Sequence, residues 1–188
     1  MKQAEIIKKM SDDELRKQLL LSQSILFLIS IVLSFFLFSH FTDWLQYFIF
    51  DWKQILLYGV FIGLVVVCIE LILYKFVPKR FFDDGGINEK IFKNQTIYHI
   101  FIISLVVAIS EEFLFRGVFQ TTFGYIFASS LFVLMHFRYL RKPFLLILTI
   151  IVSFLIGYLF EMTQNLLVTI AFHFVVDFLL GLSIRLKK

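Results

Sequence analysis

The chain of 188 residues holds almost no cysteine and almost no proline, 1 and 2 residues respectively. Cys68 has no partner for an intramolecular disulfide, so we expect it to act as a small buried hydrophobic residue. Because proline breaks helices, its scarcity leaves room for long uninterrupted helices. The short alternating segments that a membrane β-barrel needs are also missing, so helices are the expected structure.

Apolar side chains are present in excess. Hydrophobic residues make up 60% of the chain, with 26 phenylalanines and a mean hydropathy of +0.88. An ordinary soluble domain has about 45 to 50% apolar residues, so this composition predicts a membrane protein. The first apolar run lacks a small-residue cleavage site, and we therefore expect a retained first span instead of a removable signal peptide.

Six apolar runs approach the length of about 20 residues that a helix needs to cross a bilayer. The predicted fold class is all-α, a polytopic membrane bundle of about six transmembrane helices. The second and fifth runs are almost featureless, whereas the third, fourth and sixth contain ionisable residues. The six runs are Leu20–Phe38, Ile55–Tyr74, Ile97–Phe119, Phe123–Tyr139, Phe144–Phe160 and Leu166–Ile184.

Positive charge is concentrated in alternate loops. Basic residues gather before the first run, after the second, after the fourth and in the C-terminal tail. By contrast, loops 40–54 and 161–165 together contain only one lysine or arginine, Lys53. Because basic loops stay in the cytoplasm, this alternation predicts that both termini are cytoplasmic. The formal net charge of +4 therefore relates to membrane orientation, and we expect no nucleic-acid partner.

The runs divide the chain into three segments within one domain. Residues 1–19 form a cytoplasmic N-terminal segment, either an amphipathic helix on the membrane surface or a solvated helical cap. Residues 20–96 contain two transmembrane helices without polar residues at their centres and a basic loop. Residues 97–188 contain the three runs with ionisable residues and a short basic tail, and are expected to carry the functional site.

The ionisable residues in apolar runs are the most informative feature of the sequence. A charge inside a membrane span costs about 2.5 to 3.5 kcal/mol on insertion scales, and persists mainly where it pairs or takes part in chemistry. Glu112 and Arg116 are four residues apart and can pair on one helix face, which leaves Glu111 on a neighbouring face as a candidate base. His173 and Asp177 also share a face, where the carboxylate would orient the imidazole or join it in binding a metal or a substrate oxygen.

Each of these residues also has a purely structural interpretation. Glu111, Glu112 and Arg116 would in that case end a helix at the membrane surface, beside the polar residues that follow. His136, alone on its apolar run, would be a hydrogen-bonded interfacial residue, which is the commoner role for such a histidine. The histidine and aspartate of the last run would form an interhelical hydrogen bond that only holds the bundle together.

The candidate residues lie at similar depths in the predicted membrane spans, and this allows them to act together in one reaction. Glu111, His136 and His173 lie near the middle of their predicted spans, so a tilted bundle can bring them to one cavity. A carboxylate and two histidines could there activate a water, stabilise an oxyanion and protonate a leaving amine, which is the chemistry of peptide-bond hydrolysis.

Other classes of membrane protein fit the sequence less well. The chain lacks the His-Glu-x-x-His, Gly-x-Ser-x-Gly and Gly-x-Gly-Asp patterns of other membrane proteases. A proton-coupled transporter also uses buried acids and histidines. Such a transporter usually has repeated halves and interrupted helices, which the sequence does not show.

With these residues the chain resembles the CPBP family of intramembrane proteases, also called the Abi or CAAX protease family, which includes the type II CAAX prenyl endopeptidases. The likeness extends from Ile97 to Leu182, nearly half of the chain. Any one of its motifs would be weak, but three in order, each on a predicted membrane helix, are specific. They are Glu-Glu-x-x-x-Arg from Glu111 to Arg116, Phe-x-x-x-His from Phe132 to His136, and His173 followed four residues later by Asp177.

The resemblance implies a role for the residues of the first two motifs. Glu111 would be the general base that activates water together with His136. Glu112, held by Arg116, would support the site, and Phe132 would be a further supporting residue.

For the last motif, the resemblance implies that His173 and Asp177 stabilise the tetrahedral oxyanion. Some members have asparagine where this chain has Asp177. An ionised aspartate cannot donate a hydrogen bond, so Asp177 would orient His173 or be protonated by burial. The family has been described both as metalloproteases and as glutamate-dependent enzymes, and Glu111, His136, His173 and Asp177 could supply ligands to zinc or another divalent metal. We expect no cofactor and a metal-independent activation of water.

The resemblance leaves several substrates open. Eukaryotic relatives trim prenylated C-terminal CAAX peptides, whereas short bacterial relatives are associated with bacteriocin self-immunity, peptide maturation and the processing of signalling peptides. The size and minimal loops of this chain resemble the bacterial members, so we expect an integral multi-pass protein of the bacterial plasma membrane. Its expected partners are the lipid bilayer and a membrane-associated peptide or protein substrate. The alternative is a non-proteolytic immunity or binding protein of the same fold.

Overall fold

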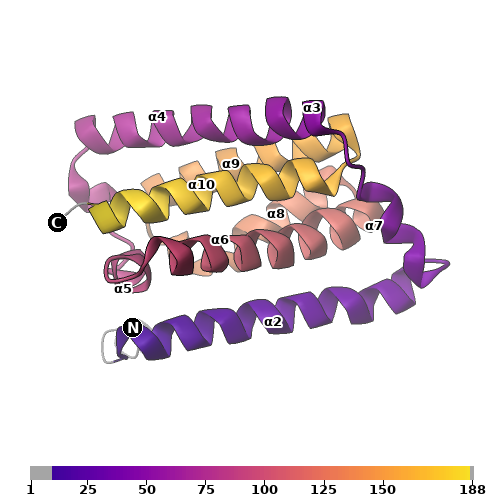
Figure 1. Ribbon diagram of the computed structural model, residues 1–188, viewed down its shortest axis with the longest axis horizontal. Helices are drawn as coiled ribbons and strands as arrows, with labels where there is room; N and C mark the ends of the chain where they lie inside the picture. Colours follow the sequence, from indigo (N-terminus) through magenta and orange to yellow (C-terminus); the bar gives the residue numbers. More distant parts are fainter. Residues whose placement is uncertain (1–9, 187–188) are drawn as a thin grey trace.

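The computed structural model describes residues 10–186, which form a bundle of helices (Figure 1). About half of the predicted N-terminal segment, residues 1–9, and residues 187–188 lie outside the described part. Five helices are long and apolar enough to cross a membrane, in agreement with the predicted fold class. They are α2 (Asp12–Leu37), the continuous helix α3–η2–α4 (Trp52–Phe76), the continuous helix α6–η4–α7 (Ile97–Phe123), α9 (Pro143–Thr163) and α10 (Leu166–Leu186).

Several of these helices are composite, and shorter elements connect them. The composite helices divide into α3 (Trp52–Gln54), η2 (Ile55–Phe61), α4 (Ile62–Phe76), α6 (Ile97–Glu112), η4 (Phe113–Gln120) and α7 (Thr121–Phe123). The helices η2 and η4 are π-helical. The shorter elements are η1 (Phe41–Tyr47), η3 (Lys79–Phe82), α5 (Ile87–Phe92), α8 (Tyr125–Met135) and η5 (Phe137–Tyr139).

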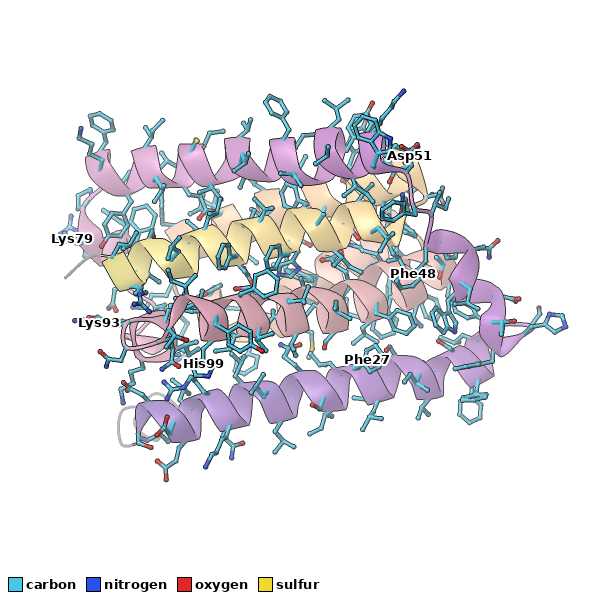
Figure 2. The ribbon with its side chains drawn as sticks, viewed as in Figure 1. Phe27, Phe48, Asp51, Lys79, Lys93 and His99 are labelled. Carbon is cyan, nitrogen blue, oxygen red and sulfur yellow. The ribbon has the colours of Figure 1, made fainter. Side chains whose placement is uncertain are left out.

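Both ends of the described chain lie at the same end of the bundle (Figure 1). Lys79 and Lys93 lie at this end, whereas Asp51 lies at the opposite end (Figure 2). The alternation of basic loops is therefore an alternation between the two ends of the molecule. That the basic end faces the cytoplasm stays a prediction from the distribution of charge.

The fourth predicted span, Phe123–Tyr139, is not a full crossing. The helix α8 has 11 residues, and at 1.5 Å per residue it is about 16 Å long, roughly half of the hydrocarbon core. It starts after Gly124, whose positive φ of 87° separates it from α7, and it ends at His136, which leaves the helical conformation. Because α8 starts at the end of the bundle opposite the termini, this early stop leaves His136 inside the bundle instead of at a surface.

The outer surface of the bundle is apolar, as expected for a protein surrounded by lipid. Large hydrophobic side chains are exposed along the outer helices, among them Phe36 on α2 and Phe76 on α4. Cys68 is also exposed on α4, so the expectation that it is buried was wrong. Lipid tails are as apolar as a protein core, and a small hydrophobic residue therefore fits either environment.

The helix α10 lies at the centre of the bundle and packs against α6, η2, α4 and α9. It runs in the same direction as η2 and α4, and two glycines four residues apart bring these helices close together. A Cβ atom on Gly59 would lie 2.8 Å from the carbonyl oxygen of Val168, and one on Gly63 would lie 3.2 Å from that of Phe172. Glycine at this spacing is a common means of close helix packing in membranes.

We expect the substitution Gly59→Ala to push η2 away from α10, because the added methyl group would overlap a backbone oxygen that cannot rotate aside. The cost of such overpacking is about 1 to 3 kcal/mol. Thermal unfolding in detergent measures the loss. Val65→Leu, which enlarges an exposed side chain on the same helix, is the control and should unfold at the wild-type temperature. Equal melting temperatures for Gly59→Ala and wild type would contradict the close packing of these two helices.

Candidate active site

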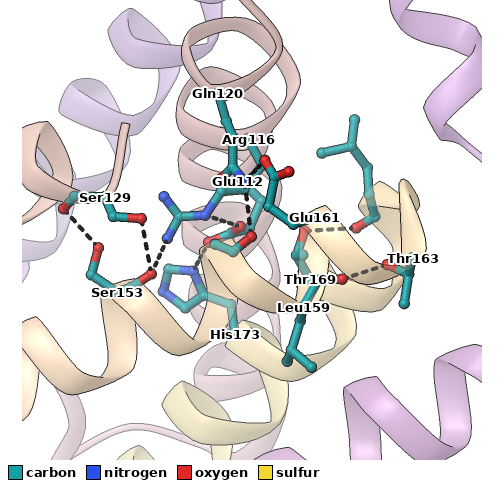
Figure 3. Close-up of polar contacts among 12 residues, drawn as sticks. Glu112, Arg116, Gln120, Ser129, Ser153, Leu159, Glu161, Thr163, Thr169 and His173 are labelled. Atoms are coloured by element: carbon teal, nitrogen blue, oxygen red, sulfur yellow. Dashed lines mark hydrogen bonds and ion pairs between the residues drawn. The ribbon is translucent and has the colours of Figure 1, made fainter. Parts of the chain in front are cut away.

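A fully buried ion pair is the innermost part of the site. Glu112 ends α6 and Arg116 lies one turn further, in η4, where Arg116 Nε is 3.3 Å from Glu112 Oε2 (Figure 3). Neither side chain is exposed. The guanidinium also donates to the carbonyl oxygen of Ser153 on α9 at 3.1 Å, and its Cζ lies 5.1 Å from the centre of the Phe132 ring. The pair expected from the spacing therefore forms, and it connects η4 with α8 and α9.

His173 of α10 extends this ion pair toward the other side of the bundle. Its Nδ1 lies 2.9 Å from Glu112 Oε1 (Figure 3). Its Nε2 lies 3.5 Å from Asp177 Oδ2. Both ring nitrogens thus face carboxylates, and a ring that carries both protons can donate to each of them. In that state the charges alternate in sign from Arg116 through Glu112 and His173 to Asp177.

Glu111 points to a different face of α6 and has a different partner. Its Oε1 accepts a hydrogen bond of 2.9 Å from the side-chain amide of Gln23 on α2, and both residues are buried. A carboxylate only accepts hydrogen bonds, so the amide nitrogen must be the atom of Gln23 that faces it. Gln23 therefore fixes the orientation of Glu111 and uses one of its two carboxylate oxygens.

The orientation of His136 is fixed by its own helix. Its Nδ1 lies 2.9 Å from the carbonyl oxygen of Phe132, and because a carbonyl only accepts, Nδ1 must carry the proton of the neutral ring. The other nitrogen, Nε2, then keeps a lone pair. The ring also stacks on Phe132, with 4.6 Å between ring centres, and Phe132 lies edge-on to His173 at 6.2 Å. Phe132 is thus in contact with both histidines.

A cavity of about 580 Å³ brings these residues together. Glu111, His136, His173 and Asp177 all line it, whereas Glu112 and Arg116 lie behind its wall. Lys79 of η3 and Arg138 of η5 also line it, which places one end of the cavity at the basic end of the bundle. The structure therefore separates a group of cavity residues from a buried group that supports them.

This arrangement excludes one structural alternative and leaves a second one open. Glu111, Glu112 and Arg116 lie inside the continuous helix Ile97–Phe123 and are buried, so they do not end a helix at the membrane surface. His136 has a hydrogen bond to its own helix, as a structural residue would, but it also lines the cavity.

The four candidate metal ligands are not all close to one another. Within residues 10–186, no group of three or more His, Cys, Asp or Glu side chains lies in an arrangement that could hold a metal ion. Both nitrogens of His173 already face carboxylates. The four candidate ligands thus line one cavity without converging on one point.

Two residues of the cavity were missed in the sequence. Gln23 and Glu70 both line it, although neither was named among the candidate site residues. Glu70 was visible by the criterion that identified the other residues, because it is an acidic side chain inside an apolar run. Gln23 carried a weaker signal, since a neutral amide near the start of a span is common in any membrane helix.

The chain is similar to known proteins in the region that carries the three motifs. The family described as type II CAAX prenyl endopeptidase Rce1-like matches residues 93–179, a range that contains all three motifs. The uncharacterized protein YpbD of Bacillus subtilis (strain 168) is 42% identical over 134 residues, which is 71% of this chain and 71% of that protein. No solved structure matches the chain.

We expect Arg116→Met to be strongly destabilising, because it leaves the carboxylate of Glu112 buried without its cation. Removing one partner of a buried pair costs about 3 to 5 kcal/mol. The double variant Glu112→Gln/Arg116→Met should recover part of the loss, as measured by unfolding in detergent. Lys93→Met, which breaks the exposed pair with Glu89, is the control and should change little. A single variant no less stable than the double one would argue against an ionised pair.

Proposed function

Because the chain belongs to the Rce1-like family of type II CAAX prenyl endopeptidases, we propose that it is an intramembrane endopeptidase that hydrolyses a peptide bond through a glutamate-activated water. The observation that carries the proposal is the shared cavity. The cavity is lined by Glu111, which has one oxygen hydrogen-bonded to Gln23, and by His136, which has a free lone pair on Nε2. It is also lined by His173, which lies beside the carboxylate of Asp177. The five long apolar helices support a multi-pass membrane location.

Glu111 is the general base of the proposed reaction. Gln23 holds its Oε1, so Oε2 is the oxygen left to accept a proton from water. The Nε2 of His136 can accept the second proton of the same water in a hydrogen bond and orient it, since Nδ1 is occupied by the carbonyl of Phe132. The water oxygen then adds to the peptide carbonyl carbon as its proton moves to Glu111.

His173 stabilises the negative charge that develops on the carbonyl oxygen. Glu112 accepts the hydrogen bond from Nδ1 of His173. The proton on Nε2 of His173 lies on the cavity side, where Asp177 and the substrate oxygen are its two possible acceptors. Asp177 orients this nitrogen and favours the protonated ring. When the tetrahedral intermediate collapses, the C–N bond breaks and the proton on Glu111 passes to the leaving nitrogen, so the products are a carboxylic acid, which keeps the second proton of the water, and an amine.

For the substrate we propose a membrane-associated peptide or protein, which reaches the cavity from the basic end of the bundle. This end would be the cytoplasmic one, and the match to a Bacillus protein supports a bacterial plasma membrane. The residues of the cavity suffice for this chemistry without a metal, and we propose a metal-independent reaction.

Glu111→Gln is expected to abolish cleavage, because the amide cannot take a proton from water, while the hydrogen bond with Gln23 can persist and preserve the fold. The measurement is cleavage of a panel of membrane-associated and prenylated peptides by purified protein in lipid, with and without a chelator. Glu161→Gln, a matched change on α9 outside the cavity, is the control and should remain active.

Each result of this experiment has a distinct meaning. Activity that survives the chelator but not Glu111→Gln supports the metal-independent proposal. If activity is lost with the chelator and restored by zinc, the reaction depends on a metal, and Glu111, His136, His173 and Asp177 are the candidate ligands. If the variant retains full activity, Glu111 is not the general base and the proposed mechanism is wrong. If the variant protects a host as well as wild type without any cleavage, the chain is a non-proteolytic immunity protein.

Gln23→Met is expected to lower kcat about 10- to 100-fold with little change in KM, because the unanchored carboxylate of Glu111 no longer faces the water. Methionine has nearly the same size, so packing between α2 and α6 should persist. Gln18→Met on the exposed side of the same helix is the control. An unchanged kcat for Gln23→Met would show that the hydrogen bond serves only helix packing.

A further inference from the structure

Glu70 of α4 lines the cavity but has no part in the proposed reaction. It is partly buried and lies inside a membrane-spanning helix, where an ionisable side chain needs a partner. Within residues 10–186 its carboxylate makes no hydrogen bond and no ion pair. Its position therefore calls for an explanation that the fold alone does not give.

The packing of α4 on α10 determines where Glu70 lies. Gly59 and Gly63 hold the two helices close together, and one turn later Val67 packs against Val176. Since the helices run in the same direction, the next turn brings Glu70 close enough to Asp177 for their charges to act on each other. Two carboxyl groups thus line the same part of the cavity.

The depth of Glu70 places it between the catalytic residues and the open end. Asp177 follows His173 by one helical turn toward the C-terminus, and Glu70 follows Val67, which packs in one cluster with Val176. Lys79, which also lines the cavity, lies at the basic end of the bundle (Figure 2). Glu70 therefore lies on the part of the cavity wall between His173 and the basic end.

The charges along the cavity leave one position unfilled. The alternating series of Arg116, Glu112, His173 and Asp177 is followed by Glu70, so two carboxyl groups are neighbours where the series calls for a positive group. A pair of carboxylates inside a membrane-spanning bundle is stabilised by a cation placed between its members.

The other acidic side chains near the open end already have partners. Asp83 pairs with Lys142, and Glu89 pairs with Lys93. Asp84 accepts hydrogen bonds from backbone amides at the start of α5. These residues are therefore satisfied within the fold, and Glu70 stands apart from them.

We propose that Glu70, together with Asp177, is a specificity subsite that binds the cationic side chain of a substrate lysine or arginine near the scissile bond. One helical turn is about 5.4 Å and an extended peptide advances about 3.3 Å per residue, so the cation would lie within about two residues of that bond. This inference rests on the proposed function and names its substrate class: peptides with a basic residue beside the cleaved bond.

The test uses one cleavable peptide in matched versions that carry lysine, glutamine or glutamate at each of the two positions on either side of the scissile bond. At one of these positions wild type should cleave the lysine version at least about tenfold more efficiently, in kcat/KM, than the glutamine version. Glu70→Gln should remove this preference without lowering kcat for the glutamine version. Glu70→Lys should reverse the preference and favour the glutamate version.

Two controls separate specificity from damage to the fold. Glu161→Lys makes the same reversal of charge on an exposed residue of α9 and should keep the wild-type preference. Glu70→Gln preserves side-chain size, so it remains informative if Glu70→Lys fails to fold. Equal cleavage of all versions by wild type, or an unchanged preference in both Glu70 variants, would overturn the subsite and leave the protease intact.

Binding distinguishes failure of the subsite from failure of the proposed function. Fluorescence anisotropy of the labelled peptides with Glu111→Gln protein measures recognition without cleavage. If wild type cleaves none of the peptides but this protein binds the lysine version more tightly, and Glu70→Gln removes that difference, the subsite stands and the hydrolytic function fails. If the lysine and glutamine versions bind equally, the subsite itself is wrong.

Discussion

The buried ion pair of Glu112 and Arg116 is the interaction on which the rest of the site depends. An isolated charge in an apolar interior costs several kcal/mol even after relaxation, so neither residue could remain buried without the other. The pair also needs further partners, and these come from three other helices: the carbonyl of Ser153 on α9, the ring of Phe132 on α8 and the imidazole of His173 on α10. Satisfying one buried pair thus fixes the relative positions of the four helices that form the site.

The short helix α8 converts this packing into an accessible site. A helix of full length would have carried the Phe132 segment across the bilayer and filled the space beside α10. Because α8 ends at His136, this histidine lies at the inner end of a cavity that extends to the basic end of the bundle. The half-length helix therefore places a polar side chain at depth beside a cavity that extends to the basic end of the bundle.

The sequence predicted what depends on length and local spacing. Five of the six spans follow from apolar runs. The pairing of Glu112 with Arg116 follows from their spacing of four residues along one helix. The end of α8 was missed, because hydropathy continues through Phe137 although the backbone leaves the helix at His136. The bond between Gln23 and Glu111 was also missed, since it joins residues 88 positions apart and depends on how α2 packs against α6. Burial of Cys68 was wrong because hydropathy cannot distinguish a lipid-facing side from an interior one.

The distribution of cavity residues along the chain separates the motif residues from the cavity residues of the two N-terminal helices. All the motif residues lie within residues 93–179, the part that matches the family, whereas Gln23 and Glu70 come from the two helices that precede it. The motif helices position the groups that act on the peptide bond in the proposed reaction, and the buried ion pair constrains them. The helix α4 closes the cavity with a side chain, Glu70, that the ion pair does not constrain. A related chain could therefore keep the proposed reaction and exchange α4, as long as α2 still supplies the partner that orients Glu111.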